Sequence, residues 1–375
     1  MIREKLVKYK VEIVVFSIFL FYLILVRSVI PIFKGRLFPV GEWVIDWDYY
    51  IKMSQDIFSI FKSQIIEPFC YRPLVPFIAG NMRFDLETNY LLINFFAVYF
   101  TGIILYFTLR LEFNRGISSF GLLVFCYLNY LPTAGIELFP EYAFYNALFY
   151  EIYNVDSMTL FFLMLGFYCI LSSKKRLYCI SLVLGVLTKE IVLITIPVYL
   201  IHEFMKRDRS KSKREMGATF LRSTAFIVPG ILTYFILRAI IVPQPLNADP
   251  RAYWVWHIRA YDGNEYGSIG MIMMFLKIRV NQILHEYALL KWTFGSWGIT
   301  LLVLCLFNKK DTFIKWLKLY LLFMILIYSQ MLIGIAETKY IHQGFFPMIF
   351  LGAAGLNRIY ELLSNYIAKR RSLIQ

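Results

Sequence analysis

The sequence VEIVVFSIFLFYLILVRSVI at residues 11–30 is apolar and long enough to cross a hydrocarbon core of about 30 Å as one helix. The segment that follows it contains DWDYY at residues 46–50, where two carboxylates stand beside aromatic side chains. Carboxylates held at a membrane boundary are costly and are often functional. Together the two stretches predict a membrane protein with a polar site just outside its first crossing.

The composition supports the same class of protein. The chain has 375 residues, of which 59% are hydrophobic and 17% charged, more apolar surface than a soluble domain can bury. The net charge of +14 does not indicate nucleic acid, because the basic residues form short runs between apolar segments. These runs are Arg3–Lys10, Lys174–Arg176, Lys206–Arg214, Lys309–Lys318 and Lys369–Arg371.

Basic runs mark the cytoplasmic side of a membrane protein, and here they predict about ten crossings with both termini in the cytoplasm. We therefore expect an all-α polytopic protein of the cell membrane. It would form a single transmembrane domain over residues 1–375, with an outer loop at 242–284 and no separate soluble domain. The predicted helical segments are 11–30, 88–109, 117–133, 157–173, 177–188, 191–204, 219–241, 286–307, 316–336 and 345–363.

The first outer loop has its own helical pattern. Its apolar positions recur at steps of three and four residues, which predicts an amphipathic helix on the membrane surface. They are Trp47, Tyr50, Ile51, Ile57, Phe58 and Phe61. Asp46 stands at the start of this helix, where a carboxylate can cap free N–H groups. A plain N-cap and a catalytic carboxylate both remain open, and the two roles can divide between Asp46 and Asp48.

A short hairpin is the second informative region. Its arms, 177–187 and 191–204, are roughly 17 to 21 Å long at 1.5 Å per residue, too short to cross the membrane. The apex Thr188-Lys189-Glu190 therefore lies at a depth where charges need partners. Lys189 and Glu190 can form a structural ion pair with each other. Alternatively, Lys189 holds a phosphate, and Glu190 orients it or ties the hairpin to the bundle.

Over about residues 40–200 the order of these motifs resembles the GT-C superfamily of integral-membrane glycosyltransferases, which contains protein O-mannosyltransferases and aminoarabinose transferases. The motifs are DWDYY at 46–50, YRPLVP at 71–76, Asp156-Ser157, the basic run at 174–176 and GVLTKE at 185–190. The C-terminal half is similar in topology, with a final outer ETKY at 337–340. Two features depart from the family: no soluble domain follows the last helix, and the first motif offers two aspartates.

The resemblance implies a GT-C-like bundle that moves a sugar from a polyprenyl-phosphate donor to a lipid, glycan or protein acceptor on the outer face. Nucleotide sugars are absent there, and a phosphate leaving group needs no protonation. One carboxylate base can therefore suffice, whereas a glycosidase usually needs a second carboxyl as acid. Asp46 is the expected base, with Asp48 as the other candidate. The departing phosphate needs positive charge in a partly dry site.

The best-placed cations for that phosphate are Arg72, Lys189 and Lys339, although each can instead extend to lipid headgroups. Supporting roles are expected for Tyr50, Asp156 and Glu190, with helix capping as the alternative for Asp156. A divalent ion at Asp46 and Asp48 is conceivable, but no further residues complete a ligand set. We therefore predict no metal and no other cofactor.

Three other functions stay open. A polymerase or ligase of surface polysaccharide also spans the membrane about ten times and would rely on Arg and His in an outer loop, as at Arg251, His257 and Arg259. A transporter usually shows paired repeats with broken helices, and the sequence shows no convincing repeat. The third alternative is a non-catalytic membrane scaffold.

Overall fold

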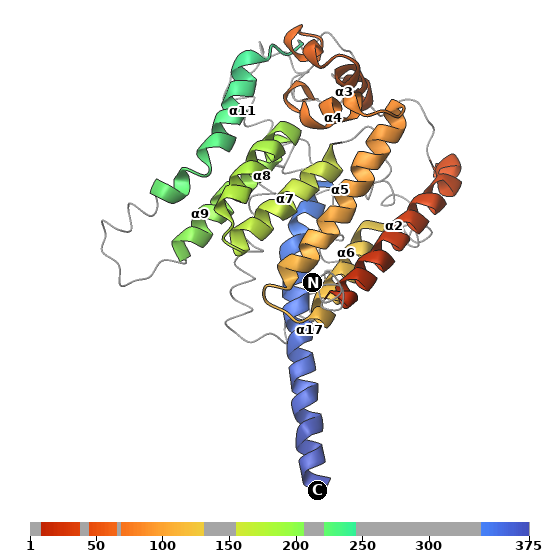
Figure 1. The fold of residues 1–375 in the computed structure, drawn as a ribbon, viewed down its shortest axis with the longest axis vertical. Helices are drawn as coiled ribbons and strands as arrows, with labels where there is room; N and C mark the ends of the chain where they lie inside the picture. The colour runs from red at the N-terminus through yellow and green to blue at the C-terminus, as the bar shows by residue number, and fades with distance from the viewer. Residues whose placement is uncertain are drawn as a thin grey trace, which may run out of the picture. The chain divides into compact units, whose positions relative to one another are not determined.

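The computed structural model describes residues 9–37, 45–65, 69–130, 155–205, 221–244 and 339–374. Over these residues the chain is helical and contains no β-strand, which confirms the all-α part of the predicted fold class (Figure 1). The predicted segments 286–307 and 316–336, and most of the outer loop at 242–284, lie outside the described residues.

The chain divides into two compact units, Met1–Ile104 with Cys126–Tyr253, and Leu105–Phe125 with Trp254–Gln375. A single transmembrane domain stays a prediction. The described elements are α2 (Lys10–Leu37), α3 (Ile45–Gln55), η1 (Ile57–Phe61), η2 (Phe69–Tyr71), α4 (Leu74–Asn81), α5 (Leu86–Leu109), α6 (Arg115–Tyr130), α7 (Asp156–Leu171), α8 (Lys175–Thr188), η5 (Glu190–Ile194), α9 (Thr195–Met205), α11 (Val228–Ile240) and α17 (Lys339–Ile374).

One helix of the described chain, α5, is long and apolar enough to cross a membrane, with 24 residues. Shorter apolar helices occur at Arg115–Cys126, in α7 and in α11. Large apolar side chains are exposed on several helices: Phe21 of α2 is 66% exposed and Phe235 of α11 is 61% exposed. Such faces are unusual for a protein surrounded by water. The count of ten crossings stays a prediction.

The segment that contains the DWDYY motif is helical as predicted, but its helix is not continuous. Helix α3 ends at Gln55, and Asp56 is extended, with its carboxylate accepting a 3.0 Å hydrogen bond from the Phe58 N–H. This cap begins the separate helix η1, so the expectation of one helix to Phe61 is wrong at Asp56. The hydrogen bond from Lys62 lowers the pKa of the Asp56 carboxyl.

The predicted hairpin is present in the first unit. Lys175 near the start of α8 pairs with Glu203 of α9, and the rings of Tyr178 and Tyr199 stack 4.6 Å apart, so the two arms are antiparallel. Near the apex, a Cβ on Gly185 would lie 2.6 Å from a methyl carbon of Val192. Glycine therefore lets the chain turn tightly through η5. The hairpin packs against α7 and α11.

Candidate functional site

Lys189 lies at the apex of the hairpin and reaches another helix. The residue is extended (φ −166°, ψ 133°) because α8 ends at Thr188 and η5 begins at Glu190. Its Nζ lies 2.5 Å from Oδ1 of Asp156, the first residue of α7, and both side chains are buried. The carboxylate also stands at the positive end of the α7 dipole, which favours its charge. The pair therefore joins the apex to α7.

Glu190 reaches a different element. Its carboxylate accepts two hydrogen bonds from Arg72, at 3.0 Å from Nη2 and 3.3 Å from Nε, and a paired geometry of this kind is strong and directional. The Glu190 carboxylate is partly buried, so the charge of Arg72 offsets the cost of its desolvation. The two charged residues of the apex thus have partners on two separate segments.

Arg72 is positioned by the short segment that leads into α4. Its N–H donates to the Phe69 carbonyl at 3.0 Å, and Pro73 precedes the first turn of α4. The guanidinium lies 5.6 Å from the centre of the Phe69 ring, and that ring stacks on Tyr49. From this buried position Nη1 of Arg72 donates a 3.3 Å hydrogen bond to the Tyr50 hydroxyl. Arg72 therefore links the hairpin apex to α3.

Helix α3 is held from other sides as well. The Tyr90 hydroxyl of α5 donates a 3.3 Å hydrogen bond to the Tyr50 carbonyl and lies 2.9 Å from the Ser54 hydroxyl. A Cβ on Gly80 would lie 2.0 Å from the Ser54 carbonyl oxygen, so only glycine allows α4 to approach α3 this closely. These contacts fix the orientation of the helix that carries the DWDYY motif.

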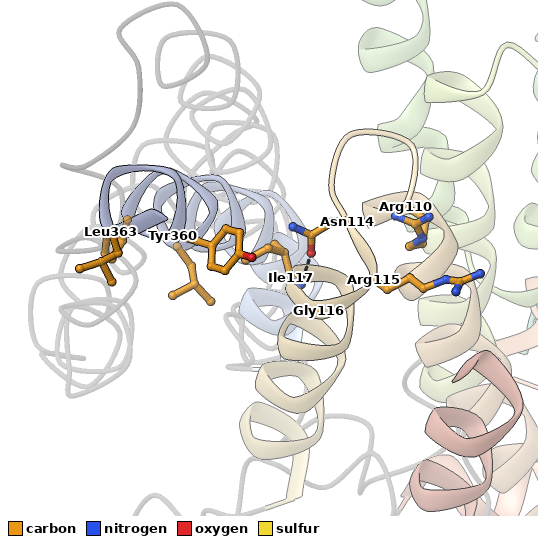
Figure 2. Close-up of a pocket in the computed structure, with 9 residues that line it drawn as sticks. Arg110, Asn114, Arg115, Gly116, Ile117, Tyr360 and Leu363 are labelled. Atoms are coloured by element: carbon orange, nitrogen blue, oxygen red, sulfur yellow. Dashed lines mark hydrogen bonds between the residues drawn. The ribbon is translucent and has the colours of Figure 1, made fainter. Parts of the chain in front are cut away.

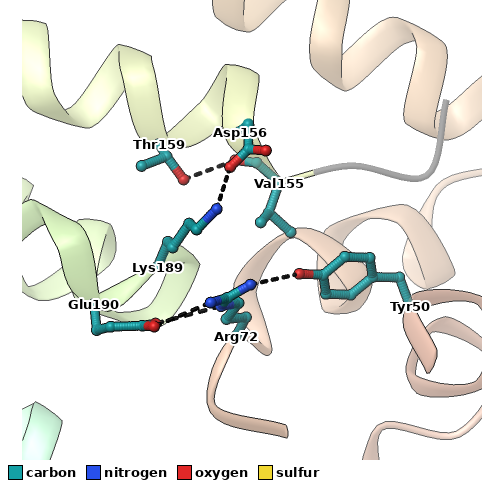
Figure 3. Close-up of polar contacts among 7 residues, drawn as sticks. All are labelled: Tyr50, Arg72, Val155, Asp156, Thr159, Lys189 and Glu190. Atoms are coloured by element: carbon teal, nitrogen blue, oxygen red, sulfur yellow. Dashed lines mark hydrogen bonds and ion pairs between the residues drawn. The ribbon is translucent and has the colours of Figure 1, made fainter. Parts of the chain in front are cut away.

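The structure brings together five of the residues selected from the sequence (Figure 3). They are Tyr50, Arg72, Asp156, Lys189 and Glu190, and we call them the apex cluster. They come from α3, the end of η2, α7 and the α8–η5 turn, all in the first unit. The guanidinium of Arg72 and the ammonium of Lys189 face the carboxylates of Glu190 and Asp156, so the formal charges of the apex cluster cancel.

Three further residues were predicted for the site: Asp46, Asp48 and Lys339. Asp46 is in the first turn of α3, one residue after the helix begins, rather than at its N-cap, and Asp48 is exposed on the same helix. Lys339 begins α17 in the second unit. The catalytic role of Asp46 or Asp48 and the phosphate-binding roles of the cations stay predictions.

One notable cation was missed by the sequence analysis. Arg238, in the last turn of α11, lies 4.3 Å from the centre of the Tyr71 ring and 4.0 Å from that of Tyr234. Beyond α11, the N–H of Gln244 donates to the Ile65 carbonyl at 2.8 Å, which joins this end of the helix to the segment that follows η1. The only signal in the sequence was an arginine near the C-terminal end of the apolar segment 219–241.

The second unit holds a cavity of about 820 Å³ between the start of α6 and α17 (Figure 2). Arg110 and Arg115 lie on the side away from Tyr360, and none of the predicted site residues line it. The lining residues are Arg110, Asn114, Arg115, Gly116, Ile117, Leu356, Ile359, Tyr360 and Leu363. Across the described ranges, no group of three or more His, Cys, Asp or Glu is arranged to hold a metal ion.

Comparison of the chain with protein-family models, curated proteins and solved structures finds no match in any of the three.

Proposed function

We propose that the chain is a membrane glycosyltransferase of the GT-C type, which moves a sugar from a polyprenyl-phosphate donor to an acceptor on the outer face. The observation that carries this proposal is the apex cluster. Arg72 and Glu190 are hydrogen-bonded across 118 positions of sequence, and the same Arg72 contacts Tyr50 of the motif helix. Residues selected for one chemical function thus lie together in a largely buried polar group.

A bundle of about ten crossings, with the motif helix at the outer surface, is part of the proposal. It is supported by the apolar helix α5, by the exposed phenylalanines of α2 and α11, and by the separation of the basic runs. In a bilayer such apolar faces contact lipid chains, and a helix forms the hydrogen bonds of its own backbone N–H and C=O groups.

Asp46 is proposed as the general base. It precedes Tyr50 by one turn of α3, and residues four apart lie on one face of a helix. Asp46 takes the proton of the acceptor hydroxyl as its oxygen bonds to the anomeric carbon of the sugar. The bond from that carbon to the phosphate oxygen breaks, and the polyprenyl phosphate leaves with the electron pair. The fixed orientation of α3 would hold the base in place during this step.

The test compares three carboxylates of the same segment: Asp46→Asn, Asp48→Asn and, as the matched control, the exposed Asp56→Asn. Lipid-linked sugars and envelope glycans are measured by mass spectrometry in cells that carry each variant. Asp46→Asn should fold normally and reduce transfer by about 10²-fold or more, with the donor accumulating. Asp48→Asn should have a smaller effect and Asp56→Asn none.

If Asp48→Asn abolishes transfer while Asp46→Asn retains it, the base is Asp48. If neither change matters, the transferase proposal fails. The rival polysaccharide polymerase or ligase depends on Arg251, His257 and Arg259, which lie outside the described residues.

A further inference from the structure

We infer that Arg238 binds the phosphate of the lipid-linked donor, an assignment that rests on the proposed function. The residue lies outside every motif by which the chain resembles a glycosyltransferase. It emerges from the distribution of charge around the apex cluster and from the two aromatic rings that hold its guanidinium.

The cations of the apex cluster are already matched by carboxylates. Lys189 pairs with Asp156 and Arg72 pairs with Glu190, and in both pairs the cation is buried. A phosphate that arrives beside two matched ion pairs meets nearly as much negative as positive charge. Removing either carboxylate from its partner would strand a charge in a poorly solvated place, which is unfavourable. The leaving group therefore needs positive charge from elsewhere.

Arg238 has that charge. Among the described residues no carboxylate forms an ion pair with it, and its contacts there are with the faces of Tyr71 and Tyr234. Contact with a ring face holds a guanidinium plane without using its N–H donors. Those donors can then form paired hydrogen bonds with phosphate oxygens, the geometry in which arginine binds phosphate best.

The position of Arg238 is also suitable. Tyr71, on which it stacks, immediately precedes Arg72, and α11 packs against both α8 and η5, which meet at the apex. Two structural roles compete with phosphate binding. A cation in the last turn of α11 is favoured by the helix dipole, and an arginine at a membrane boundary can extend to lipid headgroups. Neither role gives specificity for a polyprenyl phosphate over its alcohol.

The experiment measures binding of undecaprenyl phosphate and of uncharged undecaprenol to the full chain in detergent. Wild type should bind the phosphate more tightly than the alcohol. Arg238→Gln should weaken phosphate binding by about 10-fold or more, the usual effect of losing charged hydrogen bonds, and leave binding of the alcohol unchanged. The matched control is Arg222→Gln, which removes an exposed arginine preceding α11 and should change neither affinity.

Each outcome is decisive. If wild type does not prefer the phosphate, the proposed lipid-linked donor is contradicted and the role of Arg238 with it. If wild type prefers the phosphate and Arg238→Gln keeps that preference, the role of Arg238 alone is overturned. Should Arg238→Gln fail to fold, Arg238→Lys replaces it. Lysine keeps the charge but lacks the planar fork, so phosphate binding should fall several-fold, and an unchanged affinity would overturn the assignment.

Discussion

The two ends of the α8–α9 hairpin carry similar chemical groups in different arrangements. At the base, Lys175 of α8 pairs with Glu203 of α9, and both contact the Ser223 hydroxyl. The ion pair at the base thus joins the two arms to each other and to the segment before α11. At the apex, Lys189 and Glu190 reach away from the hairpin, to Asp156 of α7 and to Arg72 beside α4.

We interpret the base pair as structural and the apex pairs as part of the proposed site. The base pair joins the two arms to Ser223, in the segment before α11, and none of these three residues belongs to the motif helix α3. The apex pairs instead connect segments that are remote in sequence, and through Tyr50 they reach the helix that carries Asp46 and Asp48. Buried ion pairs often contribute little net stability, so an arrangement of this kind is better explained by positioning than by stability.

The largest stability effect is expected at the deepest pair. Lys189→Met keeps the aliphatic stem but leaves the buried Asp156 carboxylate without its ammonium partner. We expect a loss of about 3–5 kcal/mol in the free energy of unfolding, measured by thermal or denaturant unfolding in detergent. The double variant Lys189→Met with Asp156→Leu should recover most of that loss, because no charge is then stranded. If Lys189→Met were as stable as wild type, the pair of Lys189 and Asp156 would have to be solvated rather than buried.

A smaller effect is expected at the base of the hairpin. The Glu203 side chain is 10% exposed, but Lys175 is 32% exposed and the Ser223 hydroxyl still donates a hydrogen bond to Glu203 when Lys175 is removed. Lys175→Met should reduce the free energy of unfolding by about 1 kcal/mol or less and leave sugar transfer per folded molecule unchanged. A loss of transfer at constant stability would place the base of the hairpin in the functional site, and the contrast between the two ends would fail.

Much of the local structure follows from the sequence. Hydrophobic periodicity and length gave the segments 88–109 and 157–173, and the structure has α5 and α7 there with bounds that differ by at most two residues. The short hairpin was predicted from its polar apex, which interrupts an apolar stretch. The break at Asp56 was missed because the apolar spacing continues through it, while the Asp56 side chain caps a new helix.

The partners of the charged residues could not be predicted. Burial depth indicated that Lys189 and Glu190 need partners, but the choice of Asp156 and Arg72 depends on how α7 and the segment before α4 pack on the apex. For the same reason the contact of Arg238 with Tyr71 has no local signature. Side-chain direction across elements is a property of tertiary packing, which periodicity alone does not specify.

The central claim is that the charges of the apex position the motif helix for chemistry. Its most direct test is sugar transfer per folded molecule for Glu190→Gln against Glu203→Gln, two equivalent changes at opposite ends of one hairpin. Glu190→Gln weakens the hold on Arg72 and thereby on α3, so transfer should fall by about 10-fold or more, since small displacements of a catalytic group are costly. Glu203→Gln should leave it unchanged. Equal transfer by the two variants would contradict the claim.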